Sequence, residues 1–203
     1  PIVRPETFAQ MIEPHWCLDA RLTGQGFGFR RHWFGSRLAL VHAGAIQGGF
    51  VTMLTLLPSE DLALITLLNL RSSPDLFLVD HALLEALLGS PRRVRSAKDV
   101  DERVLSAAPG TYQCAPGILT TARVVNDQGR VFVERVGKKL FLRAQRGVWR
   151  DGVQMLPADE SDPTYFVLDT DGVEPAGVVL VRDGGGGITG LRTGMIELVR
   201  GTD

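Results

Sequence analysis

The hydrophobic pattern of the chain changes its period across a charged segment between residues 90 and 108, and this change constrains the fold more than any other feature. The segment opens with a Gly-Ser-Pro sequence at 89–91 and holds few large apolar side chains. Such a composition is typical of an exposed linker with at most a short helical turn. It divides the chain into a first region, 1–89, and a second region, 109–203.

In the first region, apolar runs at 50–57 and 62–70 flank Pro58 and the polar residues after it, which is the pattern of a β-hairpin. The runs show little alternation, which indicates strands covered on both faces. A helix start follows at Ser73, with proline at the first helical position, and Gly89 is a natural stop. We therefore predict an antiparallel sheet with a helix at the C-terminal end of this region.

After the linker, apolar and polar residues alternate in short segments separated by Gly, Asn and Asp turns. The candidate strands span 118–125, 130–136, 140–144, 165–169, 177–182 and 188–200. Roughly six to eight strands at this spacing are typical of an up-and-down barrel or a small sandwich. The predicted fold class is therefore α+β, in which a sheet with its helix is followed by an all-β barrel.

The composition argues against several functions. The chain has 22 Lys and Arg against 23 Asp and Glu, dispersed along its length, so no nucleic-acid footprint is present. No apolar run reaches the length of about 18 residues that a membrane span needs. The four histidines and two cysteines lack metal-ligand spacing, so we predict neither a metal nor another cofactor. The sequence assigns no cellular compartment.

The segment that is most informative about chemistry runs from 27 to 50. It holds a strand of alternating aromatic and glycine residues, a short turn, His42-Ala43-Gly44, and a Gly-Gly-Phe sequence at 48–50. In this order, with the hairpin and helix that follow, it resembles the third-motif region of the β-lactamase-like, penicillin-recognising serine hydrolases. That family includes class C β-lactamases, D,D-peptidases and D-aminopeptidases, and His42-Ala43-Gly44 matches its Lys/His-x-Gly motif.

The resemblance implies a serine acyl-enzyme mechanism on a small amide, ester or peptide substrate, β-lactams included. In this family the third motif lies on a strand that edges the cleft. By this match His42 is the polar group, Gly44 lets the substrate approach the backbone, and the N–H of Ala45 helps to bind the oxyanion. Trp33 and Gly48 are the implied substrate-binding residues.

Members of the family often carry a lipocalin-like barrel after the catalytic domain, and the Gly-Thr-Tyr sequence at 110–112 resembles the opening of such a barrel. The predicted domains are accordingly a C-terminal portion of a catalytic domain (1–89), a linker (90–108) and a lipocalin-like barrel (109–203). The role of the barrel is open, and a homo-oligomer is compatible with the resemblance.

Two other motifs of the family are absent from the sequence. No Ser-x-x-Lys is present, because Ser96 and Lys98 have the wrong spacing, and neither Tyr112 nor Tyr165 begins a Tyr-x-Asn. Both motifs precede the third one in the chain order of the family. We therefore expect them upstream of Pro1, on a longer polypeptide, and expect the isolated chain to be inactive.

Two other functions stay open: a non-enzymatic module whose barrel holds a small apolar ligand, and a pseudoenzyme or regulatory subunit that completes a site in another chain. The structural alternatives are a strand histidine at 42 and a turn or bulge glycine at 44. If the first region belongs to a larger domain, it should expose an unusually apolar face around 50–70 and the following helix.

Overall fold

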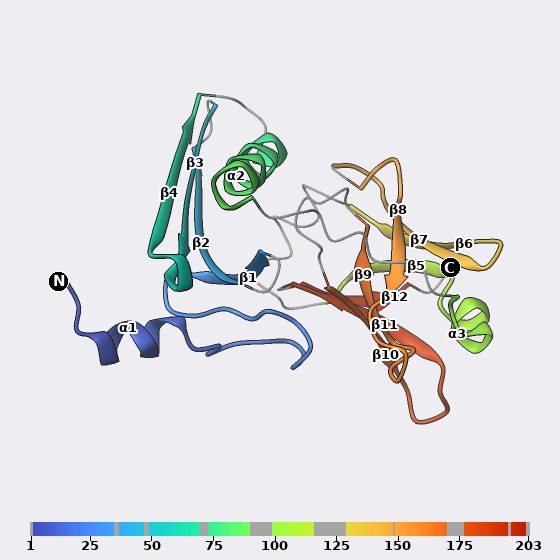
Figure 1. Ribbon diagram of the computed structural model, residues 1–203. Coiled ribbons are helices and arrows are strands. Elements are labelled where there is room, and N and C mark those ends of the chain that lie inside the picture. Colours follow the sequence, from blue (N-terminus) through green and yellow to red (C-terminus); the bar gives the residue numbers. More distant parts are fainter. Residues whose placement is uncertain are drawn as a thin grey trace. The chain divides into compact units, whose positions relative to one another are not determined.

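The computed structural model describes residues 2–34, 37–46, 49–69, 73–89, 99–115, 129–147, 149–169, 177–194 and 196–201, and for residues 46 and 73–78 it describes the backbone alone. The chain forms two compact units, drawn in Figure 1. The first comprises Pro1–Cys17, Thr23–Val94 and Asp171–Glu174, and the second comprises Leu18–Leu22, Arg95–Thr170 and Pro175–Asp203.

The first unit contains an antiparallel sheet of four strands in the order β1-β2-β3-β4. These strands are β1 (Arg30–Phe34), β2 (Arg37–Ile46), β3 (Phe50–Leu57) and β4 (Leu62–Leu68). The two apolar runs of the sequence form the β3–β4 hairpin. Its turn is a 3₁₀ helix, η1 (Pro58–Glu60), which ends at Asp61 in the left-handed conformation.

One face of this sheet is covered by the helix α2 (Ser73–Leu88), which packs next to β3 and β4 (Figure 1). The helix lies where the Ser-Pro start and the Gly89 stop predict it, and Gly89 leaves it with a φ of 59°. Leu84 packs from α2 into a small core with Phe34 and Leu57. A second helix, α1 (Pro5–Ile12), buries none of its residues, and no sequence pattern predicted it.

The opposite face of the sheet is apolar and exposed. Phe50, Ile65 and Leu67 are 60%, 68% and 71% exposed. On α2, within the side chains that the structure describes, Val79, Leu83 and Leu87 are exposed. The prediction that these strands are covered on both faces is therefore wrong within the described residues, because β3 and β4 alternate between buried and exposed positions. The prediction of an unusually apolar exposed face is confirmed.

The second unit is a closed barrel, not a sandwich, in the strand order β10-β11-β12-β5-β6-β7-β8-β9. Its strands are β5 (Gly110–Cys114), β6 (Val131–Val136), β7 (Lys139–Ala144), β8 (Val153–Pro157), β9 (Tyr165–Leu168), β10 (Gly177–Arg182), β11 (Ile188–Thr193) and β12 (Ile196–Arg200). All neighbours are antiparallel, and β12 closes the barrel by pairing with β5. The candidate strand at 118–125 lies outside the described residues.

Large apolar side chains fill the interior of the barrel. Tyr112, Met155 and Phe166 are at most 1% exposed, and every strand contributes at least one buried residue to the same cluster. The helix α3 (Glu102–Ala107) adds Val104 and Leu105 to this core. These residues fall in the stretch that the sequence assigns to an exposed linker, and in the structure they are part of the barrel core.

Residues Leu18–Leu22 belong to the second unit although they precede the whole sheet in sequence. Leu22 lies against the outer face of β10, where a Cβ on Gly177 would approach it to 2.9 Å. Arg21 donates to Asp162 at 2.5 Å and to Thr164 at 2.9 Å. The segment therefore acts as a short extra layer on the outside of the barrel.

None of the helices in the described part of the chain combines the length and the hydropathy of a membrane span.

Candidate active site

The strand that carries the predicted motif is paired on both sides over only part of its length. β1 pairs with β2 as far as Val41, whereas β3 pairs with it as far as Ile46. Among the residues that the structure describes, no strand pairs with 42–46 on the β1 side. β2 thus has an open edge that begins at His42.

Backbone groups of Ala43 and Ala45 point toward this open edge. The N–H of Arg31 in β1 donates to the Gly24 carbonyl at 3.2 Å, on the side of β1 that faces away from β2. The N–H and C=O of the preceding residue, Arg30, therefore face β2 and its partner Val41. Because backbone groups alternate sides along a strand, Ala43 and Ala45 direct their N–H and C=O groups to the same side as Val41. The N–H of Ala45, to which the family resemblance gives the oxyanion role, therefore faces the open side.

His42 is exposed, and its ring is held by a backbone carbonyl. Its Nδ1 lies 2.5 Å from the carbonyl oxygen of Gly28, which has a φ of 77°. A carbonyl oxygen only accepts hydrogen bonds, so Nδ1 carries the hydrogen in this contact. The other ring nitrogen, Nε2, takes no part in it. His42 is therefore not part of a buried core.

Gly44 lies on the same face of β2 as His42, opposite α2, and is half-buried. A Cβ at this position would come within 2.9 Å of the hydroxyl oxygen of Thr52, its cross-strand partner. Packing against Thr52 thus gives one physical reason for glycine here. Clearance for a substrate remains a prediction. Ala45 is exposed.

Trp33, one of the two predicted substrate-binding residues, does not join this group. Trp33 is 52% exposed and pairs with Leu38. Leu38 is four residues before His42 along β2, a separation of about 13 Å. Gly48 lies outside the described residues. The structure therefore brings together His42, Gly44 and Ala45 on one strand and leaves Trp33 near the other end of that strand.

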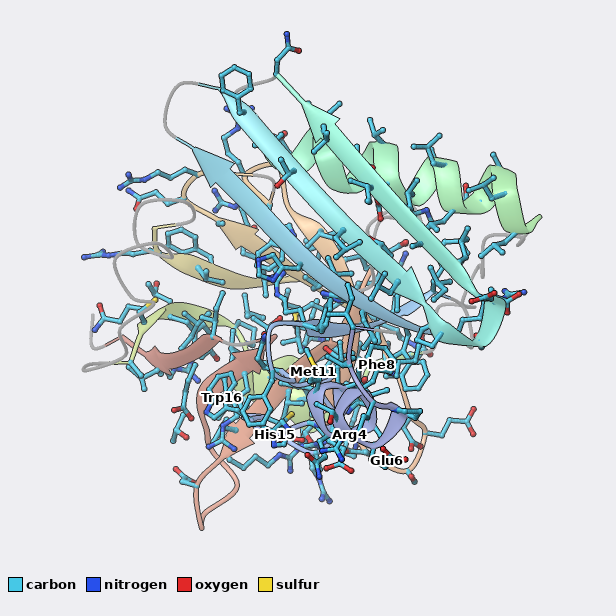
Figure 2. All side chains as sticks on the ribbon, turned by 90° about the vertical axis from the view of Figure 1, so that its left-hand side faces the viewer. Arg4, Glu6, Phe8, Met11, His15 and Trp16 are labelled. Carbon is cyan, nitrogen blue, oxygen red and sulfur yellow. The ribbon has the colours of Figure 1, made fainter. Side chains whose placement is uncertain are left out.

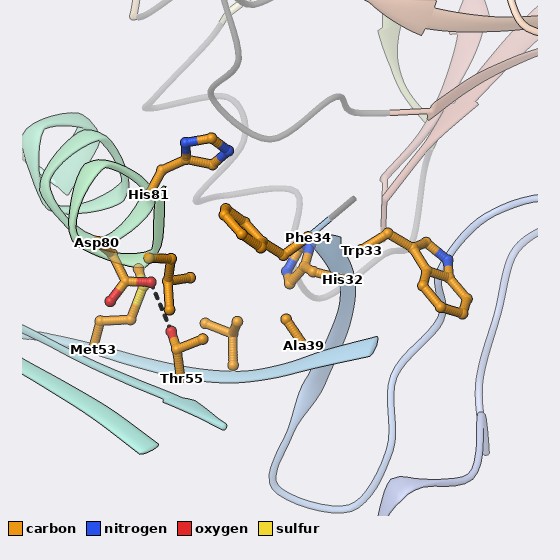
Figure 3. Close-up of a pocket in the computed structure, with 10 residues that line it drawn as sticks. His32, Trp33, Phe34, Ala39, Met53, Thr55, Asp80 and His81 are labelled. Atoms are coloured by element: carbon orange, nitrogen blue, oxygen red, sulfur yellow. Dashed lines mark hydrogen bonds between the residues drawn. The ribbon is translucent and has the colours of Figure 1, made fainter. Parts of the chain in front are cut away.

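A separate pocket with a cavity volume of about 40 Å³ lies between α2 and the face of the sheet that α2 covers, on the other side of the sheet from His42. Figure 3 shows Asp80 and His81 reaching it from the helix and His32 from β1. Trp33 is also a lining residue, but its indole points away from Asp80 (Figure 3). His42 is not a lining residue of this pocket.

Asp80 is the residue of this pocket that sequence reasoning missed. Its carboxylate is buried and accepts hydrogen bonds from the hydroxyls of Thr55 at 2.8 Å and Thr66 at 3.3 Å. Burial raises the pKa of Asp80, and the two hydroxyls oppose this shift. The signal in the sequence was weak, because Asp80 is one of two acidic residues in the apolar helix segment 76–88, and the strands that it faces carry threonines.

The imidazole of His32 has the opposite shift. Burial lowers its pKa to about 3, and the nearby charge of Arg30 adds to this effect. Among the described residues, no group of three or more His, Cys, Asp and Glu side chains is placed to hold a metal ion. The pocket therefore contains a carboxyl that is hydrogen-bonded to two hydroxyls and an imidazole that burial keeps neutral, and its other lining residues are mostly apolar.

No protein-family model and no curated protein sequence matches the chain. The crystal structure of SurE with D-Leu is similar over 97% of this chain, with 22% sequence identity and a TM-score of 0.50. The octameric penicillin-binding protein homologue from Pyrococcus abyssi aligns with 98% of this chain at 18% identity and a TM-score of 0.38. The chain spans 44% of the SurE chain and 42% of the Pyrococcus chain. The likeness to SurE shows a shared fold.

Proposed function

We propose that this chain supplies the third-motif strand of a serine acyl-transfer site, which acts on small amides, esters or peptides. The single observation that carries the proposal is the open edge of β2, where His42 stands at the start and the N–H of Ala45 points outward. The sequence holds no Ser-x-x-Lys, so the nucleophile comes from another polypeptide segment.

The chemistry of acyl transfer suits such an edge. When a serine oxygen attacks the acyl carbon, the carbonyl oxygen becomes an oxyanion that needs donors already in place. The outward N–H of Ala45 is a donor of this kind. An extended substrate can also pair with the open backbone beside Ala43, as a strand added to a sheet edge does. His42 then stands beside the reacting group as a proton-transfer residue.

The choice of substrate follows the similar fold. SurE was solved with D-Leu, and D-amino-acid peptides are among the substrates that the motif resemblance implies. Amides of D-leucine are therefore the first substrates to test. An ester of the same amino acid serves as the more reactive comparison.

The test combines this chain with the polypeptide encoded upstream of it. We expect a fluorescent penicillin or fluorophosphonate to leave the isolated chain unlabelled, and to label a Ser-x-x-Lys serine when both parts are present. The proposal fails if the isolated chain is labelled, or if the upstream reading frame encodes no Ser-x-x-Lys.

Two proline variants locate the oxyanion donor. Ala45→Pro removes the outward N–H and leaves the bonds to β3 intact, because proline is tolerated where its missing N–H faces an open edge. Loss of one oxyanion donor lowers the rate by about 100-fold or more. Ala43→Pro is the matched control and should have a smaller effect. Equal rates for Ala45→Pro and the unchanged chain would remove Ala45 from the site.

A small-ligand-binding module is the second candidate function. A closed barrel of eight strands is an architecture compatible with such binding. Tyr112, Met155 and Phe166 are buried at its centre, and these side chains occupy the space that an apolar ligand would need. Fluorescence titration of the chain with apolar dyes tests this candidate, and saturable binding that a Phe166 substitution alters would favour it.

A further inference from the structure

The carbonyl that holds His42 belongs to a well-braced loop, residues 24–29. The side-chain amide of Gln25 donates to the carbonyls of Phe29 at 2.8 Å and Gly26 at 3.3 Å. The N–H of Gly26 donates to the same Phe29 carbonyl at 2.8 Å. These bonds cross the loop from one end to the other and fix the course of the backbone at Gly28 between them.

The loop is also anchored to the segment around the end of α1. The N–H of Phe27 donates to the Met11 carbonyl at 2.8 Å, and the Phe27 ring stacks on His15 with a centroid distance of 3.8 Å. His15 in turn contacts the Gln10 carbonyl at 2.6 Å through Nε2. Figure 2 shows Met11 and His15 in this part of the first unit.

The approach at Gly26 is too close for any side chain, because a Cβ there would lie 2.3 Å from the Met11 carbonyl oxygen. The loop is therefore held at Gln25, Gly26 and Phe27. We infer that its function is to position His42: the Gly28 carbonyl selects the neutral imidazole tautomer with hydrogen on Nδ1 and leaves the Nε2 lone pair free to accept a proton at the open edge.

The catalytic meaning of this inference rests on the proposed function. A neutral imidazole carries one hydrogen, so fixing it on Nδ1 makes Nε2 the acceptor. Nε2 is then the atom of this chain that takes a proton from the nucleophile or from a group of the substrate, and returns it to the leaving group. Gln25 and Gly28 are positioning residues, because they act through His42 and touch no reacting atom.

The tautomer can be measured directly on the 203-residue chain. Long-range ¹H–¹⁵N correlation spectra at neutral pH distinguish a protonated, pyrrole-type nitrogen from a pyridine-type one. We expect the pyrrole-type shift on Nδ1 of His42 and the pyridine-type shift on Nε2. The reverse assignment, or equal populations of the two tautomers, would overturn the inference.

Gln25→Ala tests the role of the loop. Losing the bonds to Gly26 and Phe29 should release the Gly28 carbonyl and shift the His42 signals toward a mixture of tautomers. Gln154→Ala is the matched control, since Gln154 lies in the second unit and accepts one side-chain bond from Lys139 at 3.3 Å. If Gln25→Ala does not fold, the spectrum of the unchanged chain still decides the inference.

A pair of His42 variants separates this inference from the proposed function. His42→Asn places an amide nitrogen near the position of Nδ1 and can still donate to Gly28, whereas His42→Ala cannot. Both lack Nε2, so both should lose acylation in the two-part enzyme by a similar factor. The Nδ1–H tautomer without any acylation in the two-part enzyme would refute the proposed function alone. A predominant Nε2–H tautomer in an active enzyme would refute the inference alone.

Discussion

Asp80 is a buried carboxylate that accepts hydrogen bonds from two threonine hydroxyls, so its replacement tests how much these bonds stabilise the first unit. Asp80→Ala leaves the hydroxyls of Thr55 and Thr66 without an acceptor, and each unsatisfied buried group costs about 1–3 kcal/mol. We expect the first unit to lose about 2–4 kcal/mol. Asp80→Asn keeps one acceptor oxygen and removes the burial of charge, so its loss should be smaller.

Denaturant unfolding followed by tryptophan fluorescence measures this loss. A Trp149→Phe background leaves Trp16 and Trp33, which both lie in the first unit, as the reporters. An Asp80→Ala chain as stable as Asp80→Asn would contradict the role given to the two hydroxyls.

His32 should make the stability of the first unit depend on pH. Burial lowers its pKa from the ordinary 6.5 to about 3. Between these values the unfolded chain binds more protons than the folded one, so stability falls as the pH drops below about 6.5 and the loss is complete near pH 3. The side chain is half-buried by surface exposure, so we expect a loss of about 1–2 kcal/mol.

His32→Phe keeps a ring at this position and removes the proton-binding nitrogen. Its unfolding free energy, measured by fluorescence between pH 7 and about pH 4, should fall less than that of the unchanged chain. The raised pKa of Asp80 acts in the opposite direction, because the folded chain then binds its proton more readily. Both chains in this comparison keep Asp80, so its contribution cancels. Identical pH profiles of the unfolding free energy would contradict the lowered pKa of His32.

Among single elements, β4 forms one edge of the sheet in the first unit. Within the described residues its outer side has no partner strand, and its sequence contains no charged residue and no proline. Edge strands of this kind pair readily with other strands unless a charge blocks them. We expect the isolated chain to self-associate through this strand and its exposed side chains Ile65 and Leu67.

Leu67→Lys places a charge on this edge and should lower self-association, measured by sedimentation over a range of concentrations. Val136→Lys is the control, because Val136 is 59% exposed in the second unit and gains the same charge. If the two variants sediment alike, β4 is not the associating strand.

The elements that the sequence predicted best have one dominant local signal. The helix α2 begins with Ser73 and Pro74 and ends at Gly89, and the β3–β4 hairpin is set by two apolar runs around Pro58. In contrast, α1 has only eight residues and buries none of them, so its short apolar pattern did not single it out. The closure of the barrel depends on pairing between β5 and β12, residues far apart in sequence, which no local pattern specifies.

The candidate site was partly accessible from the sequence. The resemblance placed His42, Gly44 and Ala45 on one strand, because they fall within four consecutive residues. Trp33 was expected beside these residues, but the register between β1 and β2 pairs it with Leu38, nearer the start of the strand. The resemblance also did not single out Gln25, because the bonds that make this residue a brace are to backbone carbonyls, which every residue has.

At the scale of the whole molecule, Arg21 links the segment Leu18–Leu22 to the barrel through its hydrogen bonds to Asp162 and Thr164. Its hydrogen bond to Asp19 holds the pKa of that carboxyl below its usual value. Arg21→Ala should lower the stability of the second unit by about 1 kcal/mol, since Arg21 is about one third exposed. The stabilisation by the Asp19 pair is present above the usual pKa of 3.8 and fades as the pH falls through the lowered value, so the effect should shrink in acid.

Trp149 packs against the barrel core, and a chain with Trp16→Phe and Trp33→Phe reports unfolding of the second unit alone. Arg150→Ala is the control, because its 3.5 Å pair with Asp151 is 69% and 88% exposed and should contribute little. Equal stabilities for Arg21→Ala and Arg150→Ala would show that the early segment is not held by its arginine.

The outer layer formed by Leu18–Leu22 has a consequence for the modularity of the chain. If the barrel were encoded by one continuous segment, a single recombination at the linker could transfer it to another protein. In this chain, a barrel transferred in that way would lack Leu18–Leu22, the five residues that contact Gly177 and Asp162. A recipient would have to provide a matching patch of its own, so the two halves of this gene are expected to be inherited together.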